Sequence, residues 1–585
     1  MASFSFIPQS KKVLIFLNIS FLFFLTFYLR ISNFPDKTIE PTTITAHSIV
    51  SQGIMRDGCS GLHDYGDYKS QCIYVKSHIG CKPKGYINYL QIFYCTCGKF
   101  PILGHAVLLL WLAVLFYLLG NTAASYFCSS LESLSRILKL PPTIAGVTLL
   151  SLGNGASDVF ASIVSFTRSG DGDVGLNSIL GGAFFISSIV VGVISIVTSP
   201  MQISVDKPSF IRDVLFFLFS LCSLLIIILI GKINLWGAIC FVSIYLIYVS
   251  TVSASYLYHR NEQRKMNQFG ISAVSNSYFL HIQDDFGERG IPLLGYVDDE
   301  KPILMEKNSL GLEDDEQQSL RFSSFCYYFS KFLDILELPL YLPRRVTIPV
   351  VSEDKWSKPY AVISVTLAPL LLATLLNTQS EKHLGKRISL VSYMVAGFIG
   401  IFLGNLALVT TKASCPPKKC LFPWLAGGFL MSVTWTYITA EELVSLLVSI
   451  GHILGINPSV LGLTVLAWGN SLGDLIANVA MSMNGGANGA QIAISGCYAG
   501  PMFNTLVGLG MSLVFSSSSE TYLIPRDSSL YETIGFLMGG LLWALVILPR
   551  KNMKLDKFLG VGLLAIYSCF LCLRLARALG ILKPH

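Results

Sequence analysis

The sequence predicts an all-α polytopic membrane protein with an inverted repeat and about 12 to 13 transmembrane segments in total. Hydrophobic residues make up 52% of the 585 residues and charged residues only 13%, whereas a soluble protein of this size needs far more surface charge. The apolar residues occur in runs of roughly 18 to 28, the length of a helix that crosses ~30 Å of hydrocarbon. One stretch with an acidic motif also occurs twice along the chain.

The basic residues do not indicate an anionic macromolecule as a partner. The net charge is +7, but Lys and Arg lie in the loops between apolar runs, which reports orientation in the lipid bilayer. The sequence has no Gly-rich loop ending in Gly-Lys-Ser/Thr after a strand, so a nucleotide-driven pump is not expected. Neither nucleic acid nor nucleotide is therefore predicted as a partner.

The N-terminal region, residues 1–30, has the layout of a signal peptide or a signal anchor. Lys11 and Lys12 precede an apolar run, so the following segment, 31–100, is expected outside the cytosol. Five cysteines lie in that segment: Cys59, Cys72, Cys81, Cys95 and Cys97. Their spacing favours one or two disulfides over a metal site, with one thiol left free. Disulfides indicate the secretory pathway, hence the plasma membrane or an endomembrane such as the vacuole or endoplasmic reticulum.

The rest of the chain divides into two membrane-spanning sets around a polar stretch. Residues 101–257 hold five apolar segments, and 258–358 are predicted to be a cytosolic loop. Residues 359–421 hold two linking segments, and 422–585 hold five more. With the Cys-bearing segment outside, the most basic loops fall inside, as orientation rules require. The loop at 378–387 is the exception.

The repeat pairs residues 138–198 with residues 454–516. At a shift of 316 positions, Pro142 matches Pro458 and Asp158 matches Asp474. The matched stretches include Gly153-Asn154-Gly155-Ala156-Ser157-Asp158 and Gly469-Asn470-Ser471-Leu472-Gly473-Asp474. An odd number of segments separates the two starts, so the second copy crosses the membrane in the opposite direction. Such inverted repeats place two half-sites face to face near the bilayer midplane.

The two motifs predict a cation site. An ionised carboxylate in an apolar segment costs at least ~2.5 kcal/mol and needs compensation, which indicates a function for Asp158 and Asp474. Asn154 and Asn470 lie four residues earlier, on the same helix face. Ca²⁺ takes six to eight hard oxygen ligands in irregular geometry, which such groups provide. The glycines of both motifs are expected to permit unwinding or close packing of the helices.

Further polar residues make the two halves unequal. Ser471 offers a hydroxyl where the first motif has Gly155. Asn504 stands where the first repeat has Ile186, and is interpreted either as a further ligand or as a buried amide that joins helices. The residues Ser187, Ser188 and Thr505 are interpreted as lining the ion path or as bonding to their own helices.

Three other acidic or titratable features have two interpretations each. At least one of Glu441 and Glu442 is expected to point into the bundle, as a proton carrier or as a hydrogen-bonded structural group. His105 is more typical of an interfacial histidine than of a functional one. The run 313–316 is predicted to be a solvated loop rather than a regulatory cation site.

At these residues the chain resembles the calcium/cation antiporter superfamily, the sodium/calcium exchangers in the broad sense, and within it the plant-type cation/calcium exchanger branch. Those proteins carry Gly-Asn-Gly-Ala-Pro-Asp and Gly-Asn-Ser-x-Gly-Asp, and here Ser157 stands for the usual Pro. The resemblance implies two inverted sets of five helices and a cation site at Asn154, Asp158, Asn470, Ser471, Asp474 and Asn504. It also implies exchange of Ca²⁺ or monovalent cations, and it does not imply an enzyme.

The function predicted is therefore secondary active antiport. Ca²⁺, Na⁺ or K⁺ would be exchanged against Na⁺, K⁺ or H⁺, as transported ions rather than bound cofactors. The alternative is a proton-coupled K⁺/Na⁺ exchanger that does not carry Ca²⁺. A cation channel or a non-transporting scaffold is a more distant alternative, since the sequence has no repeated filter loop.

Overall fold

The computed structural model describes residues 9–32, 59–78, 81, 85–128, 130, 151–169, 172–201, 203–268, 338–351, 356–380, 386–413, 416–417, 421–484, 486–517, 521–524 and 528–578. The early part of repeat 1, the run 313–316 and residues 381–385 of the 378–387 loop lie outside these residues. Two compact units are present. The first comprises Met1–Leu118, Asp299–Arg344 and Val448–Gly455, and the second comprises the rest.

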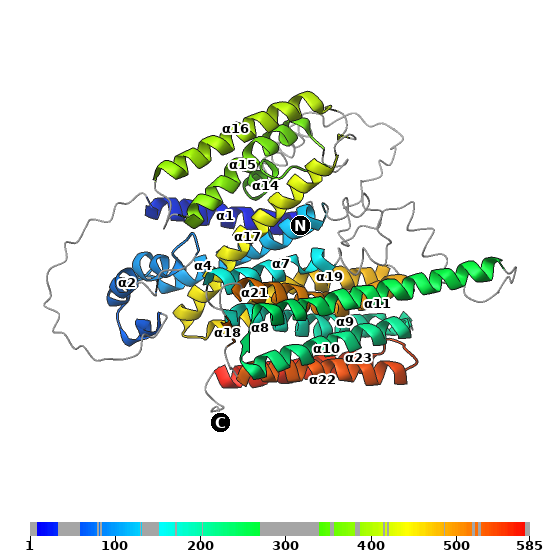
Figure 1. The fold of residues 1–585 in the computed structure, drawn as a ribbon. Helices are drawn as coiled ribbons and strands as arrows, with labels where there is room; N and C mark the ends of the chain where they lie inside the picture. Colours follow the sequence, from blue (N-terminus) through cyan, green and yellow to red (C-terminus); the bar gives the residue numbers. More distant parts are fainter. Residues whose placement is uncertain are drawn as a thin grey trace, which may run out of the picture. The chain divides into compact units, whose positions relative to one another are not determined.

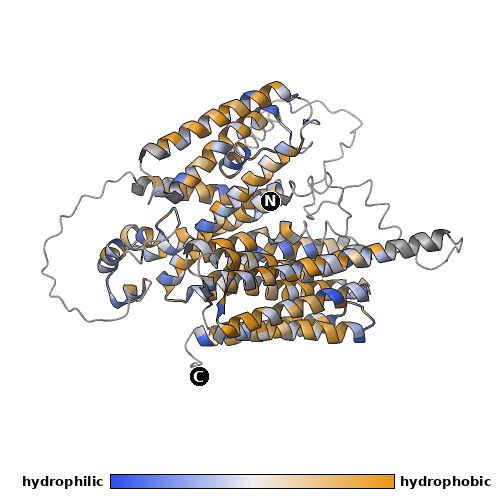
Figure 2. Ribbon diagram, in the orientation of Figure 1, coloured by the Kyte–Doolittle hydropathy of each residue, from blue (hydrophilic) through white to orange (hydrophobic). Residues whose placement is uncertain are grey.

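The fold is almost entirely helical, as predicted. Among the described residues, eleven helices are long and apolar enough to cross a membrane, and Val13–Leu29 forms a shorter apolar helix. Of the predicted segment 141–166, the structure describes helix from Ser151 onward. Figure 2 shows apolar residues along nearly all of these helices. Lipid therefore surrounds much of the surface that a soluble protein would cover with charge.

The first unit contains the N-terminal helix and the Cys-bearing segment. Its elements are α1 (Gln9–Ser32), η1 (Ser60–Asp64), α2 (Tyr68–Ser77), α3 (Tyr89–Gln91), η3 (Ile92–Thr96) and most of α4 (Pro101–Thr122). Two disulfides, Cys59–Cys81 and Cys72–Cys95, join its short helices, and Cys97 is free and buried. Both disulfides and the free thiol agree with the prediction. Burial also raises the pKa of the Cys97 thiol, which keeps it unreactive.

The second unit contains both repeats (Figure 1). Its first half consists of η4 (Ala123–Cys128), α7 (Ser151–Val164), η6 (Ser165–Ser169), α8 (Gly172–Phe184), η7 (Phe185–Val190), α9 (Val191–Thr198), η8 (Ser199–Met201), α10 (Lys207–Ile230), β1 (Lys232–Ile233) and α11 (Leu235–Gln268). The helix α11 continues to Gln268, eleven residues into the stretch that was predicted to be a loop from 258. The helix α14 (Leu338–Arg345), which belongs to the first unit up to Arg344, also forms within that stretch.

The second half follows a helical hairpin. The hairpin is α15 (Lys358–Ser380) and α16 (Lys386–Thr410), which pack side by side. The second half consists of α17 (Leu421–Leu454), α18 (Pro458–Leu461), η9 (Gly462–Leu466), α19 (Ala467–Asn484), α20 (Gly486–Phe503), η10 (Asn504–Leu509), α21 (Gly510–Ser516), β2 (Tyr522–Leu523), α22 (Ser528–Arg550) and α23 (Lys557–Ala578).

Loops of the two membrane-spanning sets pair with each other. β1 pairs antiparallel with β2, and Ser204 forms an isolated bridge with Lys554. In the predicted topology, the first pair of loops lies outside and the second pair lies inside. The contacts are therefore those that two sets crossing in opposite directions require.

The repeats also exchange contacts through their motif helices. α7 of the first repeat packs against η10 of the second, and α19 of the second packs against η7 of the first. The segments η7 and η10 are π-helical, each six residues long, and occupy matching places in the two repeats. Such π segments are frequent at functional sites because they widen a helix locally. This reciprocal packing brings both motifs into one region of the unit.

Candidate cation site between the two repeats

The Asp158 carboxylate of α7 is the centre of the site. Its side chain is buried, with 3% exposed. Asn470 Nδ2 of α19 donates to Asp158 Oδ1 over 2.8 Å, and Asn504 Nδ2 of η10 donates to Asp158 Oδ2 over 2.9 Å. An acid of the first repeat is therefore held by two amides of the second. Charge-assisted bonds of this kind stabilise an ionised carboxylate where water is scarce.

Three oxygen atoms around Asp158 remain available to a cation. Asn470 Oδ1, Asn504 Oδ1 and Ser471 Oγ are buried, and no described group is within hydrogen-bonding distance of them. Buried polar atoms are normally paired, so each such atom needs an explanation. Hard oxygen atoms beside a carboxylate are the ligand set of Ca²⁺ and of smaller hard cations. The donor set fits a transported cation.

Ser471 and Asp158 converge on the same small region. A Cβ built on Gly182 of α8 would lie 3.4 Å from Asp158 Oδ2 and 3.4 Å from Ser471 Oγ. Ser471 is fully buried. The region is therefore bordered by three helices, α7, α8 and α19.

Asp474 of α19 is the second carboxylate, and its surroundings differ. It is partly buried, and it lies close enough to Asp158 for their charges to interact. Within the described part of the chain, no side chain donates to its carboxylate. Ile186, the counterpart of Asn504, is buried at 4% exposure and has no group to donate. The side chain of Asn154 lies outside the described residues.

Gly155 has a packing role that the sequence left open. A Cβ at this position would overlap Asn504 Oδ1, whereas a Cβ at Gly473 would meet nothing within 4 Å. The motif helices α7 and α19 run without a break through both glycines. Of the two expected roles, unwinding and close packing, the structure shows close packing at Gly155 and unwinding at neither. The irregular backbone lies in the π segments instead.

The remaining candidates are two hydroxyl residues, two glutamates and one histidine. Thr505 Oγ1 donates to Pro501 O, its own helix, and Ser187 Oγ similarly reaches Phe184 O at 3.5 Å. Glu441 and Glu442 of α17 are both buried, at 3% and 6% exposure. His105 belongs to the first unit, where its ring lies against Phe93.

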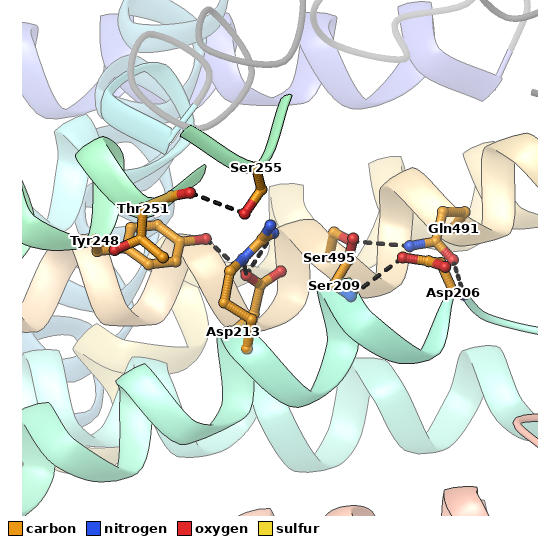
Figure 3. Close-up of polar contacts among 9 residues, drawn as sticks. Asp206, Ser209, Asp213, Tyr248, Thr251, Ser255, Gln491 and Ser495 are labelled. Carbon is orange, nitrogen blue, oxygen red and sulfur yellow. Dashed lines mark hydrogen bonds and ion pairs between the residues drawn. The ribbon is translucent and has the colours of Figure 1, made fainter. Parts of the chain in front are cut away.

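The sequence analysis missed another buried carboxylate in the second unit. Asp213 of α10 accepts bonds from Arg212 Nε and from Tyr248 Oη of α11, each over 2.9 Å. Figure 3 shows Tyr248 directed at Asp213, with Asp206 facing Gln491 of α20 farther along. The adjacent pair Arg212-Asp213 in an apolar helix was the available signal. Asp213 is thus paired with a cation of its own helix and with a hydroxyl of α11, and the second contact joins α10 to α11.

The family follows from comparison with known proteins. The model of the sodium/calcium exchanger protein family matches residues 108–254 and 424–576, which are the two membrane-spanning sets. This chain belongs to the sodium/calcium exchanger family. It is a multi-pass membrane protein, and both matched regions contain one motif each.

Relatives of this family cover nearly the whole chain. "Cation/calcium exchanger 1" of Arabidopsis thaliana is 53% identical over 577 residues, 98% of each chain. "Mitochondrial sodium/calcium exchanger protein" of Rattus norvegicus is 31% identical over 544 residues, 88% of each chain. A solved H⁺/Ca²⁺ exchanger aligns with 87% of this chain and 88% of its own at 12% identity, with a TM-score of 0.41.

Proposed function

We propose that this chain is a secondary active antiporter that exchanges Ca²⁺ or monovalent cations against Na⁺, K⁺ or H⁺ by alternating access. The observation that carries the proposal is the Asp158 carboxylate, bound by Asn470 and Asn504 of the opposite repeat. Three unpaired oxygen atoms beside it, within the described region, supply cation ligands. The relatives named above are exchangers of Ca²⁺ with other cations, which supports the same class of substrate.

Charge explains why transport would be an exchange. Asp158 and Asp474 together give the site a formal charge of −2. Moving two uncompensated carboxylates between states within a membrane is costly, because burial disfavours bare charge. One Ca²⁺, or two monovalent cations or protons, neutralises that charge. The protein therefore changes state most readily when loaded, which couples entry of one ion to exit of another.

The inverted repeat supplies the two states. Helices of opposite direction meet at one site, so rocking of one set against the other opens the site to alternate sides. Reciprocal packing of α7 on η10 and of α19 on η7 supports this, because the proposed ligands belong to the helices in contact. A channel would need a continuous path instead, whereas Asp158, Ser471 and Asn504 are buried.

The membrane is proposed to belong to the secretory pathway. Two disulfides in the Cys-bearing segment, Cys59–Cys81 and Cys72–Cys95, need an oxidising compartment to form and persist. The plasma membrane or an endomembrane, such as the vacuole or endoplasmic reticulum, offers that compartment on one side.

Reconstitution into liposomes tests the proposal. Gradients of Na⁺, K⁺ and H⁺ are imposed in turn while Ca²⁺ and Rb⁺ uptake is followed. Uptake driven by at least one opposing gradient, without a unitary conductance, is the expected result. An absence of gradient-driven flux for every cation would exclude antiport, and uncoupled conductance would identify a channel.

A further inference from the structure

The cystine-bonded segment, residues 59–100, contacts the end of α17. His63 at the end of η1 places Nε2 2.8 Å from the carbonyl oxygen of His452, in the last turn of α17. A carbonyl oxygen only accepts, so Nε2 carries the proton in this contact. Both residues belong to the first unit. The carbonyls in the last turn of a helix lack partners within the helix, and a side-chain donor stabilises that end.

The end of α17 is fixed in a special backbone conformation. Gly455 has φ of +66°, the left-handed region that ends a helix and that favours glycine. A Cβ at Gly455 would lie 3.5 Å from His63 Nε2. The imidazole therefore lies against the turn itself, where the chain leaves α17. Three residues later it enters α18, which leads through η9 into α19 with Asn470 and Asp474.

The same cystine-bonded segment also contacts the start of α4. The Phe93 ring lies 4.8 Å from the His105 ring, and Trp111 Nε1 donates to Tyr89 Oη over 2.9 Å. The disulfide Cys72–Cys95 ties this part to α2, and Cys59–Cys81 holds the start of η1. One covalently braced segment thus contacts α4, the first helix of set one, and α17, the first helix of set two.

We propose that this segment is a clasp between α4 and α17, and that His63 is a positioning residue for transport. The inference rests on the proposed antiport function. Alternating access requires the two sets to move in a coordinated way, and both helices continue from the clasp into the second unit. If the end of α17 were not held, fewer of the conformational changes would move both membrane-spanning sets together. The clasp therefore affects the maximal rate and leaves the cation ligands unchanged.

The test compares His63→Leu with His63→Gln in the full-length protein in liposomes. Leu removes the donor, while Gln keeps an N–H for the His452 carbonyl. We expect His63→Leu to lower the maximal Ca²⁺ flux about fivefold, the size of one net hydrogen bond, with an unchanged apparent KM. His63→Gln should restore most of the rate. A rate at or above wild type in His63→Leu, or a changed KM alone, would overturn the clasp.

Reduction of the folded wild-type protein gives an independent test. A phosphine that does not cross the membrane converts each S–S bond into two thiols, while the phosphine gains an oxygen atom from water. We expect reduction to lower the transport rate of wild type to that of His63→Leu and to leave the rate of His63→Leu unchanged. Hydrogen exchange at 448–455 should be faster in both reduced proteins. Additive effects, or unchanged exchange, would contradict the proposal. Absence of flux in untreated wild type would instead count against antiport. In that case the hydrogen exchange rate at 448–455 before and after reduction would still test the clasp.

Discussion

Asn504 in the second repeat donates its amide N–H to the Asp158 carboxylate in the first repeat, over 2.9 Å. The residue that matches Asn504 in the first repeat is Ile186, so Asp474 lacks this donor. Among the described side chains, the two halves of the site are therefore unequal in hydrogen bonding as well as in sequence. Two amides hold Asp158 in place, and no described side chain donates to the Asp474 carboxylate.

Replacing Asn504 with the residue of the matching position tests this asymmetry. Asn504→Ile removes a donor to a charged acceptor, an interaction of about 1.5–3 kcal/mol, and also removes a candidate ligand. We expect cation affinity to fall about tenfold or more, measured as the Ca²⁺ dependence of flux. Thr505→Val is the matched control, because the Thr505 hydroxyl donates to Pro501 O of its own helix. Equal affinity in both variants would show that Asn504 joins helices without serving the site.

Gly155 provides a test in which no candidate ligand residue is substituted. Gly155→Ala introduces a Cβ onto Asn504 Oδ1, and Gly473→Ala introduces one into open space. Overpacking of this kind costs about 1–3 kcal/mol, here by separating Asn504 from Asp158. We expect transport to fall about tenfold in Gly155→Ala and to persist in Gly473→Ala, as both proteins remain folded by size-exclusion chromatography. Similar losses in the two variants would contradict the packing role.

The N-terminal helix is predicted to be retained as an anchor. Asn18 is fully buried, and its Oδ1 accepts the backbone N–H of Leu340 over 3.1 Å. Phe24 stacks on Trp111 of α4 with ring centroids 4.1 Å apart. Cleavage would remove both contacts and expose this part of α4. Peptides from residues 13–29 should therefore be found by mass spectrometry in the purified protein, and a mature N-terminus near residue 31 would refute the prediction.

The sequence predicted those parts of the fold that depend on apolar length and on repetition. Long apolar runs fixed the spans, and the match of Asp158 with Asp474 indicated a shared site. What it could not predict depends on contacts between distant residues. The facing helix decides which amide donates to which acid. It also decides whether Gly155 or Gly473 packs closely. The pair Asp213 and Tyr248 was missed because the two residues lie 35 positions apart.

The motif glycines were expected to permit unwinding or close packing, and the backbone of the site does not show the unwinding. Unwinding at the motif glycines is typical of discontinuous helices, but α7 and α19 continue through them. Local widening occurs instead in η7, η9 and η10, which contain few residues that signal a helix break. A π segment arises from packing against neighbours, so composition alone gives little indication of it.

Ca²⁺ binding to purified single variants tests most directly whether the two repeats form one site. Binding is measured by equilibrium dialysis for wild type, Asp158→Asn, Asp474→Asn and the control Asp213→Asn. One shared site predicts that both Asp158→Asn and Asp474→Asn lose saturable binding, while Asp213→Asn retains it. Wild-type affinity in either Asp158→Asn or Asp474→Asn would contradict a site built from both repeats.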